Sequence, residues 1–283
     1  MKKTIIFLLA IGFGMVSCTS QEQSETVTPK GYPITFHSGP SNPTITNGEY
    51  GIISFFATSG DTSLMPEPME QEIRIPKEYN KKADLIGGMM MMGEGDSVTI
   101  HIPMDSLPAQ SKSNPLITDG IYYHIKIKDI LDSTTYAAQK EAEMQQMMEQ
   151  KMKVDTLLSE HLVLYKDGQL SDQLLKLNSG LEILVLEEGT GAEINSGDLI
   201  TVGYTGVFEK SGEIFDSSFG KGKGFDLAVG TGSVIKGWDE GLQEFNKGGK
   251  GILFIPYDLA YGESGRGSIG PKEDLVFYVE IDQ

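Results

Sequence analysis

The chain has 283 residues and a formal net charge of −17, with 40 acidic and 23 basic side chains. This length is sufficient for two ordinary domains, each with its own hydrophobic core. A surface of this charge repels phosphate backbones, and no compact Lys/Arg cluster offsets it, which argues against nucleic-acid binding. Neutral, apolar or basic partners fit the charge.

Residues 1–17 have the pattern of a secretory signal peptide. Two lysines precede an apolar run, residues 4–13, that is too short to span a bilayer. Small residues then lead into Cys18, the only cysteine. A lone thiol in an oxidising compartment has no disulfide partner, so the predicted use of Cys18 is chemical attachment.

This arrangement resembles a bacterial lipobox, in which Cys18 becomes the lipidated N-terminus after cleavage. An ordinary signal peptide with a chance cysteine is the alternative. The resemblance implies a lipid anchor at Cys18 that holds the protein on the membrane and not across it. It also implies a location in the bacterial cell envelope, on the periplasmic face or at the cell surface. Removal of residues 1–17, which contain two lysines and no acids, changes the net charge from −17 to −19.

Two regions of different character follow. Residues 18–31 are rich in Gln, Glu, Ser and Thr and are expected to form a flexible tether. Residues 32–132 alternate short apolar runs with turn residues, which predicts a β-rich domain with strands at 50–56, 97–102 and 121–127.

Residues 133–177 are predicted to form a helical linker. From Ser133 to about Tyr165 the sequence contains no Gly or Pro, and Asp132 or Ser133 is a candidate N-cap. A second, shorter helix is expected over Leu170–Leu177.

The long helix is expected to be amphipathic. Met144, Met148, Met152 or Lys151, and Leu158 lie close to one helical face, and stripes of this kind usually pack against another element. The spacing leaves open whether the stripe packs within the chain or against a second copy. A homodimer through the N-terminal half or the linker helix is therefore an open alternative.

Residues 178–283 predict an α+β domain. Strands are expected at 181–186, 198–204, 251–255 and 274–281. Apolar residues at i, i+3, i+7 and i+10 from Ile235 to Phe245 predict one face of a short helix. An antiparallel sheet with this helix on one face is the expected fold.

Four motifs occur in order within this last region. They are Tyr204-Thr205-Gly206, Phe215-Asp216-Ser217-Ser218, Val234-Ile235-Lys236-Gly237-Trp238 and Leu259-Ala260-Tyr261-Gly262. One carboxylate and one phenol among aromatic and β-branched residues indicate an apolar pocket that suits a proline ring. In order and spacing, the motifs resemble those of the FKBP-type peptidyl-prolyl isomerase family from Asn178 to the C-terminus.

The resemblance implies an isomerase site without cofactor or metal, and proline-containing polypeptides as partners. The catalytic residues it implies are Asp216, Tyr261 and Tyr204. The substrate-binding residues it implies are Phe215, Phe225, Val234, Ile235, Trp238, Ile269 and Phe277. Trp238 would form the floor under the proline ring, and Tyr261 and the Ile235 N–H would donate to substrate carbonyls. Each aromatic residue taken singly is more often a core residue than a site residue.

The sequence departs from the family at two positions and suggests an internal repeat. Gly203 and Arg266 stand where many members carry His. Residues 32–132 resemble a degenerate second copy of the same fold. The matched segments are 46–53 with 195–202, 95–103 with 248–256, and 121–130 with 275–281. No Phe-Asp pair follows Gly60, so this copy is expected to lack the isomerase pocket.

Other features fit weaker interpretations. The four histidines, His37, His101, His124 and His161, lack metal-ligand spacing. The glycines at 220, 222 and 224 lack the strand–turn–helix context of a phosphate loop and indicate a flexible flap. Met89–Met92 is either a soft peptide-binding surface or core filling.

Two functions other than an isomerase remain open. The first is an envelope chaperone or peptide-binding lipoprotein with little isomerase activity. The second is a surface lipoprotein that uses the fold only as a docking scaffold.

Overall fold

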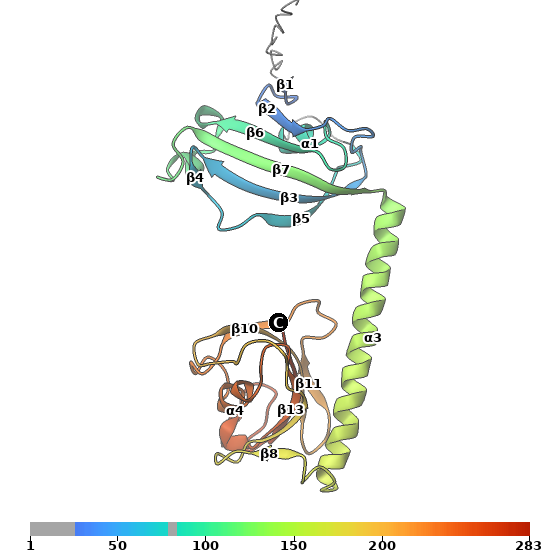
Figure 1. Ribbon diagram of the computed structural model, residues 1–283, viewed down its shortest axis with the longest axis vertical. Helices are drawn as coiled ribbons and strands as arrows, with labels where there is room; N and C mark the ends of the chain where they lie inside the picture. Colours follow the sequence, from blue (N-terminus) through green and yellow to red (C-terminus); the bar gives the residue numbers. More distant parts are fainter. Residues whose placement is uncertain (1–25, 79–83) are drawn as a thin grey trace, which may run out of the picture. The chain divides into compact units, whose positions relative to one another are not determined.

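The structure is a computed structural model that describes residues 26–78 and 84–283. The chain divides into two compact units, Met1–Tyr136 and Ala137–Gln283. Each unit is built around one antiparallel sheet (Figure 1). The predicted signal peptide and Cys18 lie outside the described residues.

The sheet of the first unit has seven strands within the described residues, in the order β1-β2-β6-β7-β3-β4, and β5 also pairs with β3. The strands are β1 (Thr26–Val27), β2 (Pro33–Ser38), β3 (Tyr50–Ser59), β4 (Thr62–Ser63), β5 (Met69–Arg74), β6 (Ser97–Pro103) and β7 (Gly120–Leu131). The helices are α1 (Asp84–Met89), the 3₁₀ helix η1 (Met104–Ser106) and α2 (Ala109–Lys112). The three predicted strands are confirmed, and each continues beyond its predicted C-terminal end.

The tether prediction is wrong at its C-terminal end. Thr26 and Val27 pair with Ile34 and Pro33, and Thr28 is buried. A polar composition favours disorder only where no partner strand is within reach, and the edge of β2 supplies one here.

The sheet of the second unit also has seven strands within the described residues, in the order β11-β10-β14-β13-β9-β8, and β12 pairs with β10. The strands are β8 (Leu174–Lys176), β9 (Glu182–Glu187), β10 (Leu199–Phe208), β11 (Ile214–Ser217), β12 (Phe225–Ala228), β13 (Lys250–Ile255) and β14 (Leu275–Ile281). The helices are α4 (Lys236–Gly241) and the 3₁₀ helices η2 (Leu242–Glu244) and η3 (Tyr257–Leu259). The four strands and the short helix predicted here are confirmed.

The two sheets have the same strand order. Read from the opposite end, the first sheet runs β4-β3-β7-β6-β2-β1, which matches the second strand for strand. The turns before β3 and β10 match too. Gly48 (φ 87°) donates its N–H to the Ile75 carbonyl at 3.0 Å, and Gly197 (φ 97°) donates to the Val229 carbonyl at 2.8 Å. Glycine adopts this positive φ without steric cost. The predicted repeat is confirmed in its strand order.

Helix α3 (Ser133–Lys166) follows β7 in the chain. Asp132 is its N-cap, because the Asp132 carboxylate accepts hydrogen bonds from the N–H groups of Thr134 (2.7 Å) and Thr135 (2.9 Å). Gly168, with φ 70°, follows the C-terminus in the left-handed conformation that commonly ends helices.

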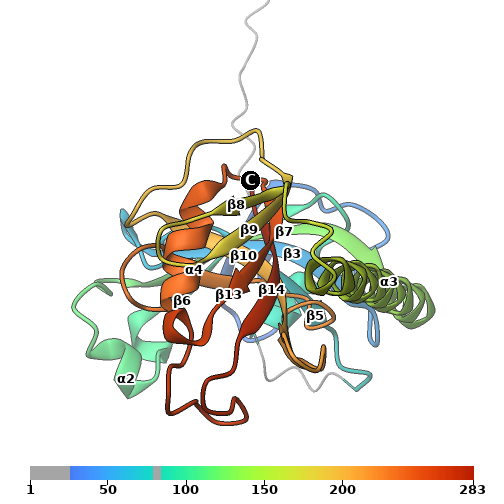
Figure 2. The same cartoon turned by 90° about the horizontal axis from the view of Figure 1, so that it is seen from below.

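The second sheet is buried on both faces, with α4 on one side and α3 on the other (Figure 2). The cluster on the α4 side includes Trp238, Leu242, Leu253, Ile255, Phe277 and Val279. The cluster on the α3 side includes Val154, Leu158, Leu162, Ile252, Phe254 and Tyr278. Alternate residues of each strand point to opposite faces, so β13 and β14 contribute to both clusters.

The predicted methionine stripe is not the packed face of α3. Met144, Met148 and Met152 are 65%, 56% and 64% exposed, whereas Val154, Leu158 and Leu162 are buried against the sheet. The packed face lies to one side of the methionines, and its buried residues are branched aliphatic, with Tyr165 stacked on Phe254 at the C-terminal end of the helix. The long helix is confirmed, and Leu158 of the predicted stripe packs within the chain, whereas the methionines do not. Packing of the methionines against a second copy stays a prediction.

The short helix predicted over Leu170–Leu177 is also wrong. Residues 167–173 form turns, and Leu174 and Leu175 pair with Leu184 and Ile183 in the sheet. Leucine has a good helix propensity, but pairing with β9 outweighs it at this position.

Met89–Met92 is core filling and not a surface. Met89 and Met92 are buried, and Met90 packs against the same cluster on one face of the first sheet. Among the described residues, no helix is long and apolar enough to cross a membrane.

Candidate functional site

Two of the predicted catalytic residues, Asp216 and Tyr204, meet on a β-hairpin. Tyr204 lies on β10, and Asp216 lies on β11, which pairs with β10 through Gly206 opposite Asp216. The Tyr204 hydroxyl donates to Asp216 Oδ2 at 2.5 Å. The pairing register therefore brings together two residues that are twelve positions apart.

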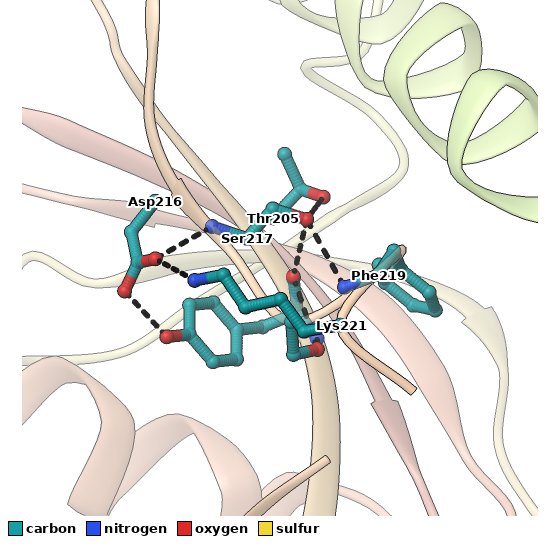
Figure 3. A network of polar contacts seen from close by, with 7 residues as sticks. Thr205, Asp216, Ser217, Phe219 and Lys221 are labelled. Atoms are coloured by element: carbon teal, nitrogen blue, oxygen red, sulfur yellow. Dashed lines mark hydrogen bonds and ion pairs between the residues drawn. The ribbon is translucent and has the colours of Figure 1, made fainter. Parts of the chain in front are cut away.

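Asp216 accepts two further hydrogen bonds (Figure 3). Lys221 Nζ donates to Asp216 Oδ1 at 2.8 Å, and the Ser217 N–H donates to the same oxygen at 2.9 Å. Burial by itself raises the pKa of Asp216, but these donors and the Tyr204 hydroxyl outweigh it and hold the pKa below its ordinary value. Asp216 is therefore an anion at neutral pH.

Tyr204 is held in its protonated form. Burial, followed by its hydrogen bond to Asp216, raises the pKa of the Tyr204 phenol well above its ordinary value. The hydroxyl thus remains a donor to the carboxylate throughout the physiological pH range.

Buried hydroxyls fix the hairpin behind these two groups. Ser218 Oγ accepts the Tyr204 N–H at 2.8 Å, and the hydroxyls of Thr205 and Ser217 are 2.8 Å apart. The Ser218 N–H donates to the Tyr204 carbonyl at 2.9 Å. Because buried polar groups are costly without partners, the two serines after Asp216 select one conformation of the hairpin.

Four aromatic rings pack beside the carboxylate, and we call Tyr204, Phe225, Trp238 and Phe277 the aromatic site. The Trp238 ring lies 5.3 Å from the ring centroids of both Tyr204 and Phe277 and 6.2 Å from that of Phe225. All three contacts are edge-to-face, the favoured geometry for aromatic pairs. Trp238 is 4% exposed, whereas Phe225 is 44% exposed and lies at the rim.

Helix α4 delivers Trp238 to this position because two of its residues are glycine. A Cβ on Gly237 would lie 2.5 Å from Ile255 Cγ2, and a Cβ on Gly241 would lie 2.9 Å from a Leu253 methyl group. The missing side chains let the helix approach the sheet closely. The indole Nε1 of Trp238 is buried without a hydrogen-bond partner in the described residues.

The other predicted site residues pack around the same cluster. Phe215 contacts Phe277 edge-to-face at 5.5 Å, and Ile269 is buried. Val234, Ile235 and Tyr261 are partly buried against the cluster. Ile235 is the N-cap residue of α4, and its N–H donates to no acceptor within the described part of the chain. All ten predicted site residues therefore lie in one region.

The sequence analysis missed Lys221. It lies in the glycine-rich stretch that was interpreted only as a flap, between Gly220 (φ 82°) and Gly222 (φ 72°). The available signal was a lysine five residues after Asp216. Spacing across a loop, however, does not determine where a side chain points. The hydrogen bond becomes visible only when the loop conformation is known.

The histidines form no metal centre in the described chain, where no three His, Cys, Asp or Glu side chains are arranged to hold a metal ion. His37, Thr99 and His124 instead form a hydrogen-bonded row on the first sheet. Thr99 Oγ1 lies 2.7 Å from His37 Nε2 and 2.9 Å from His124 Nδ1.

Comparison with known proteins matches residues 191–282 to the family of FKBP-type peptidyl-prolyl cis-trans isomerases. An "FK506-binding protein" of Neisseria meningitidis serogroup B is 46% identical over 103 residues, 36% of this chain and 94% of that protein. An "FK506-binding protein" of Streptomyces anulatus is 40% identical over 103 residues, 36% of this chain and 83% of that protein. The crystal structure of FkpA from Escherichia coli covers 56% of this chain and 74% of its own, with 28% identity and a TM-score of 0.39.

Proposed function

Because the chain belongs to the family of FKBP-type peptidyl-prolyl cis-trans isomerases, we propose that it rotates X–Pro bonds of exported or envelope polypeptides by binding the twisted amide in the aromatic site. The observation that carries the proposal is the contact between Tyr204 and ionised Asp216 beside the buried Trp238 ring.

The chemistry requires no covalent intermediate. The barrier to rotation, roughly 18–20 kcal/mol, arises from amide resonance. A site that binds the twisted amide more tightly than the planar one lowers this barrier, by about tenfold in rate for each 1.4 kcal/mol. The twisted amide has less charge separation, so it loses less solvation on entering an apolar site.

Each group then has a role in that preference. The Trp238 ring forms the floor for the proline ring, and Tyr204, Phe225, Val234, Ile235 and Phe277 form the walls. Phe215 and Ile269 complete the rim. Asp216 faces the rotating carbonyl, while the Tyr261 hydroxyl and the Ile235 N–H donate to neighbouring substrate carbonyls. None of these groups acts as a nucleophile, so the catalysis is by shape and electrostatics.

The test is a protease-free refolding assay on the soluble chain from residue 21. A client whose slow phase is prolyl isomerisation reports the rate, and Tyr261→Phe and Trp238→Leu are compared with the parent. We expect acceleration by the parent and its loss in both variants. A folded parent that gives no acceleration contradicts the proposal.

An envelope chaperone is the second candidate, supported by the first unit, which has the strand order of the second but no Phe-Asp pair after Gly60. Deletion of residues 32–132 separates the two functions. The chaperone function predicts loss of aggregation suppression with isomerase activity retained. Loss of neither activity on deletion contradicts it.

The proposed location is the cell envelope, with a lipid anchor at Cys18. The support is the sequence pattern of residues 1–17 followed by the lone cysteine. Slow X–Pro isomerisation limits the folding of many chains, so an anchored isomerase suits clients that fold after export. Cys18→Ala is expected to release the protein from membranes, and mass spectrometry of the mature N-terminus detects the acyl chains. An unmodified Cys18 in the membrane fraction contradicts the anchor.

A homodimer through α3 is also proposed, supported by the exposed methionines Met144, Met148 and Met152. Sedimentation equilibrium of the soluble chain measures its oligomeric state directly. We expect a dimer that dissociates when Met148 is replaced by Lys. A monomer at all concentrations contradicts this proposal.

A further inference from the structure

The loop between β11 and β12 connects the aromatic site with α3. At its start, the Ser218 N–H donates to the Tyr204 carbonyl at 2.9 Å. In its middle, Lys221 donates to Asp216 at 2.8 Å, as Figure 3 shows. The loop therefore supplies the charged donor among the partners described for the carboxylate.

Phe219 anchors the loop on the α3 side of the sheet. Its ring packs against the cluster that contains Leu158 and lies 5.9 Å from the ring centroid of Tyr278. A Cβ on Gly203 would lie 3.1 Å from Phe219 Cζ. Gly203 thus leaves room for this ring.

The next residues of the loop face α3. A Cβ on Gly220 would lie 3.3 Å from Lys151 Cδ, and a Cβ on Gly222 would lie 3.4 Å from Met147 Sδ. Met147 and Gln150 also line a cavity of about 260 Å³ together with loop residues 218–220 and 222–224. Within residues 141–150 of α3, Met147 is the one residue that is not exposed. Contact with the loop explains this difference.

The Lys221–Asp216 pair depends on such support. Both partners reach solvent, with side-chain exposures of 65% for Lys221 and 44% for Asp216. An exposed ion pair gains little because ordering a long side chain opposes it. The glycines on either side of Lys221 add backbone freedom. Something outside the loop must restrict it if Lys221 is to stay on the carboxylate.

We propose that Met147 and Lys151 of α3 are positioning residues of the isomerase site, which hold residues 218–224 so that Lys221 reaches Asp216. The consequence for catalysis rests on the proposed function, whereas the structural coupling does not. Met147 acts through the loop and Lys221, and it touches neither Asp216 nor the aromatic site. Lys151 acts through its aliphatic stem, since its ammonium pairs with Asp155.

The direct test measures the pKa of Asp216 by carboxyl-detected NMR in the full soluble chain. The groups that face this carboxylate are Tyr204 from β10, Lys221 from the loop and the Ser217 N–H. Lys221→Met sets the reference, because it removes the charged donor and raises the pKa of Asp216. We expect Met147→Ala to raise it in the same direction, and Met147→Leu to leave it close to that of the parent.

Met148→Ala is the matched control. It removes the same side chain one position along the helix, where Met148 is exposed. We expect no change in the pKa of Asp216. A shift equal to that of Met147→Ala would overturn the proposal, because the effect would then belong to the helix in general.

The double variant Met147→Ala with Lys221→Met decides whether Met147 acts through Lys221. We expect it to match Lys221→Met alone, both in the pKa of Asp216 and in kcat/KM, which falls by up to about fivefold. Additive effects, or no effect of Met147→Ala on the pKa, overturn the proposal. Because NMR reads the coupling without turnover, an inactive parent would contradict the proposed function and leave this test intact.

Discussion

The two sheets share one strand order but differ in what covers their second face. In the second sheet, Ile252 on β13 pairs with Tyr278 on β14, and both are buried under α3. The corresponding pair in the first sheet is Thr99 with His124. Strand order therefore survives a change from an apolar to a polar face, because backbone pairing fixes it and the outer side chains do not.

The faces of the two sheets opposite to those just compared differ at the position of the candidate site. Gly206 lies opposite Phe277 in the second sheet, and Ala57 lies opposite Tyr123 in the first. A Cβ on Gly206 would lie 2.6 Å from the Phe277 ring and 2.7 Å from the Phe215 ring. The two rings can therefore meet over Gly206, whereas Ala57 already fills the matching space. Similar sheets thus carry a site in one copy and an ordinary core in the other.

The largest effect is expected from a substitution in the packing between α3 and the second sheet. Leu158→Ala is expected to destabilise the second unit by about 2–5 kcal/mol, because it opens a cavity between α3 and the sheet. Urea denaturation followed by Trp238 fluorescence measures this, since Trp238 is the only tryptophan. Val163→Ala on the same helix is the control, with a change within about 0.5 kcal/mol because Val163 is exposed. Equal effects of the two variants would refute the packing described for α3.

The next largest effect is expected when one hydrogen bond of the candidate site is removed. Tyr204→Phe deletes the hydrogen bond to ionised Asp216, a bond type that contributes about 1.5–3 kcal/mol. If that energy is expressed in the transition state, kcat/KM falls roughly tenfold to 100-fold. Protease-free isomerase assays give the ratio. Phe55→Tyr, the reverse change at the matching position of β3, is expected to leave the rate unchanged, and an altered rate would mean that the first unit contributes to turnover.

A third experiment exchanges Gly206 and Ala57, the corresponding residues by which the inner faces of the two sheets differ. Gly206→Ala is expected to cost about 1–3 kcal/mol of stability through overpacking against two rings, with loss of isomerase activity. Ala57→Gly is expected to create no activity in a chain that also carries Trp238→Leu. Thermal unfolding and isomerase assays check both. Full activity in Gly206→Ala would show that the rings have room to move.

The pH dependence follows from the lowered pKa of Asp216. Because the folded state holds the proton less tightly than the unfolded chain, the ionised contacts contribute stability above the ordinary pKa of 3.8. This contribution is lost as the pH falls through the lower folded value. Isomerase activity is therefore expected to stay level from pH 8 to about pH 5. An activity loss near pH 6 that persists in Asp216→Asn would assign the titration to another group.

The smallest effect concerns the polar face of the first sheet. Burial and the nearby His37 lower the pKa of His124 below its ordinary value of 6.5. The unfolded chain therefore binds this proton more readily, and the first unit loses a little stability as the pH falls from 7 to 5. Histidine NMR titration measures the pKa, and His124→Gln removes this part of the pH dependence. A pKa of His124 above 6.5 would contradict the burial of its ring.

Local pattern was sufficient for much of the fold. Short apolar runs bounded by turn residues placed the main strands, and the Gly- and Pro-free run from Ser133 placed the long helix. It failed where local preference and tertiary pairing disagree. Leu174 and Leu175 joined β9 as a strand against their helical preference. Thr26 and Val27 became an edge strand in a polar segment.

By itself, the sequence determined the main strands, the long helix and the two-domain length, because periodicity and turn glycines are local properties of the chain. The internal repeat and the ten residues of the candidate site were predicted from the resemblance to the isomerase family. The tertiary structure alone decided which face of α3 packs and which loop residue reaches Asp216. Both choices depend on neighbours distant in sequence. The helix offers methionine and aliphatic faces at nearby angles, and only the sheet selects between them. Lys221 is one of many exposed lysines until the loop, held against α3, directs it to the carboxylate.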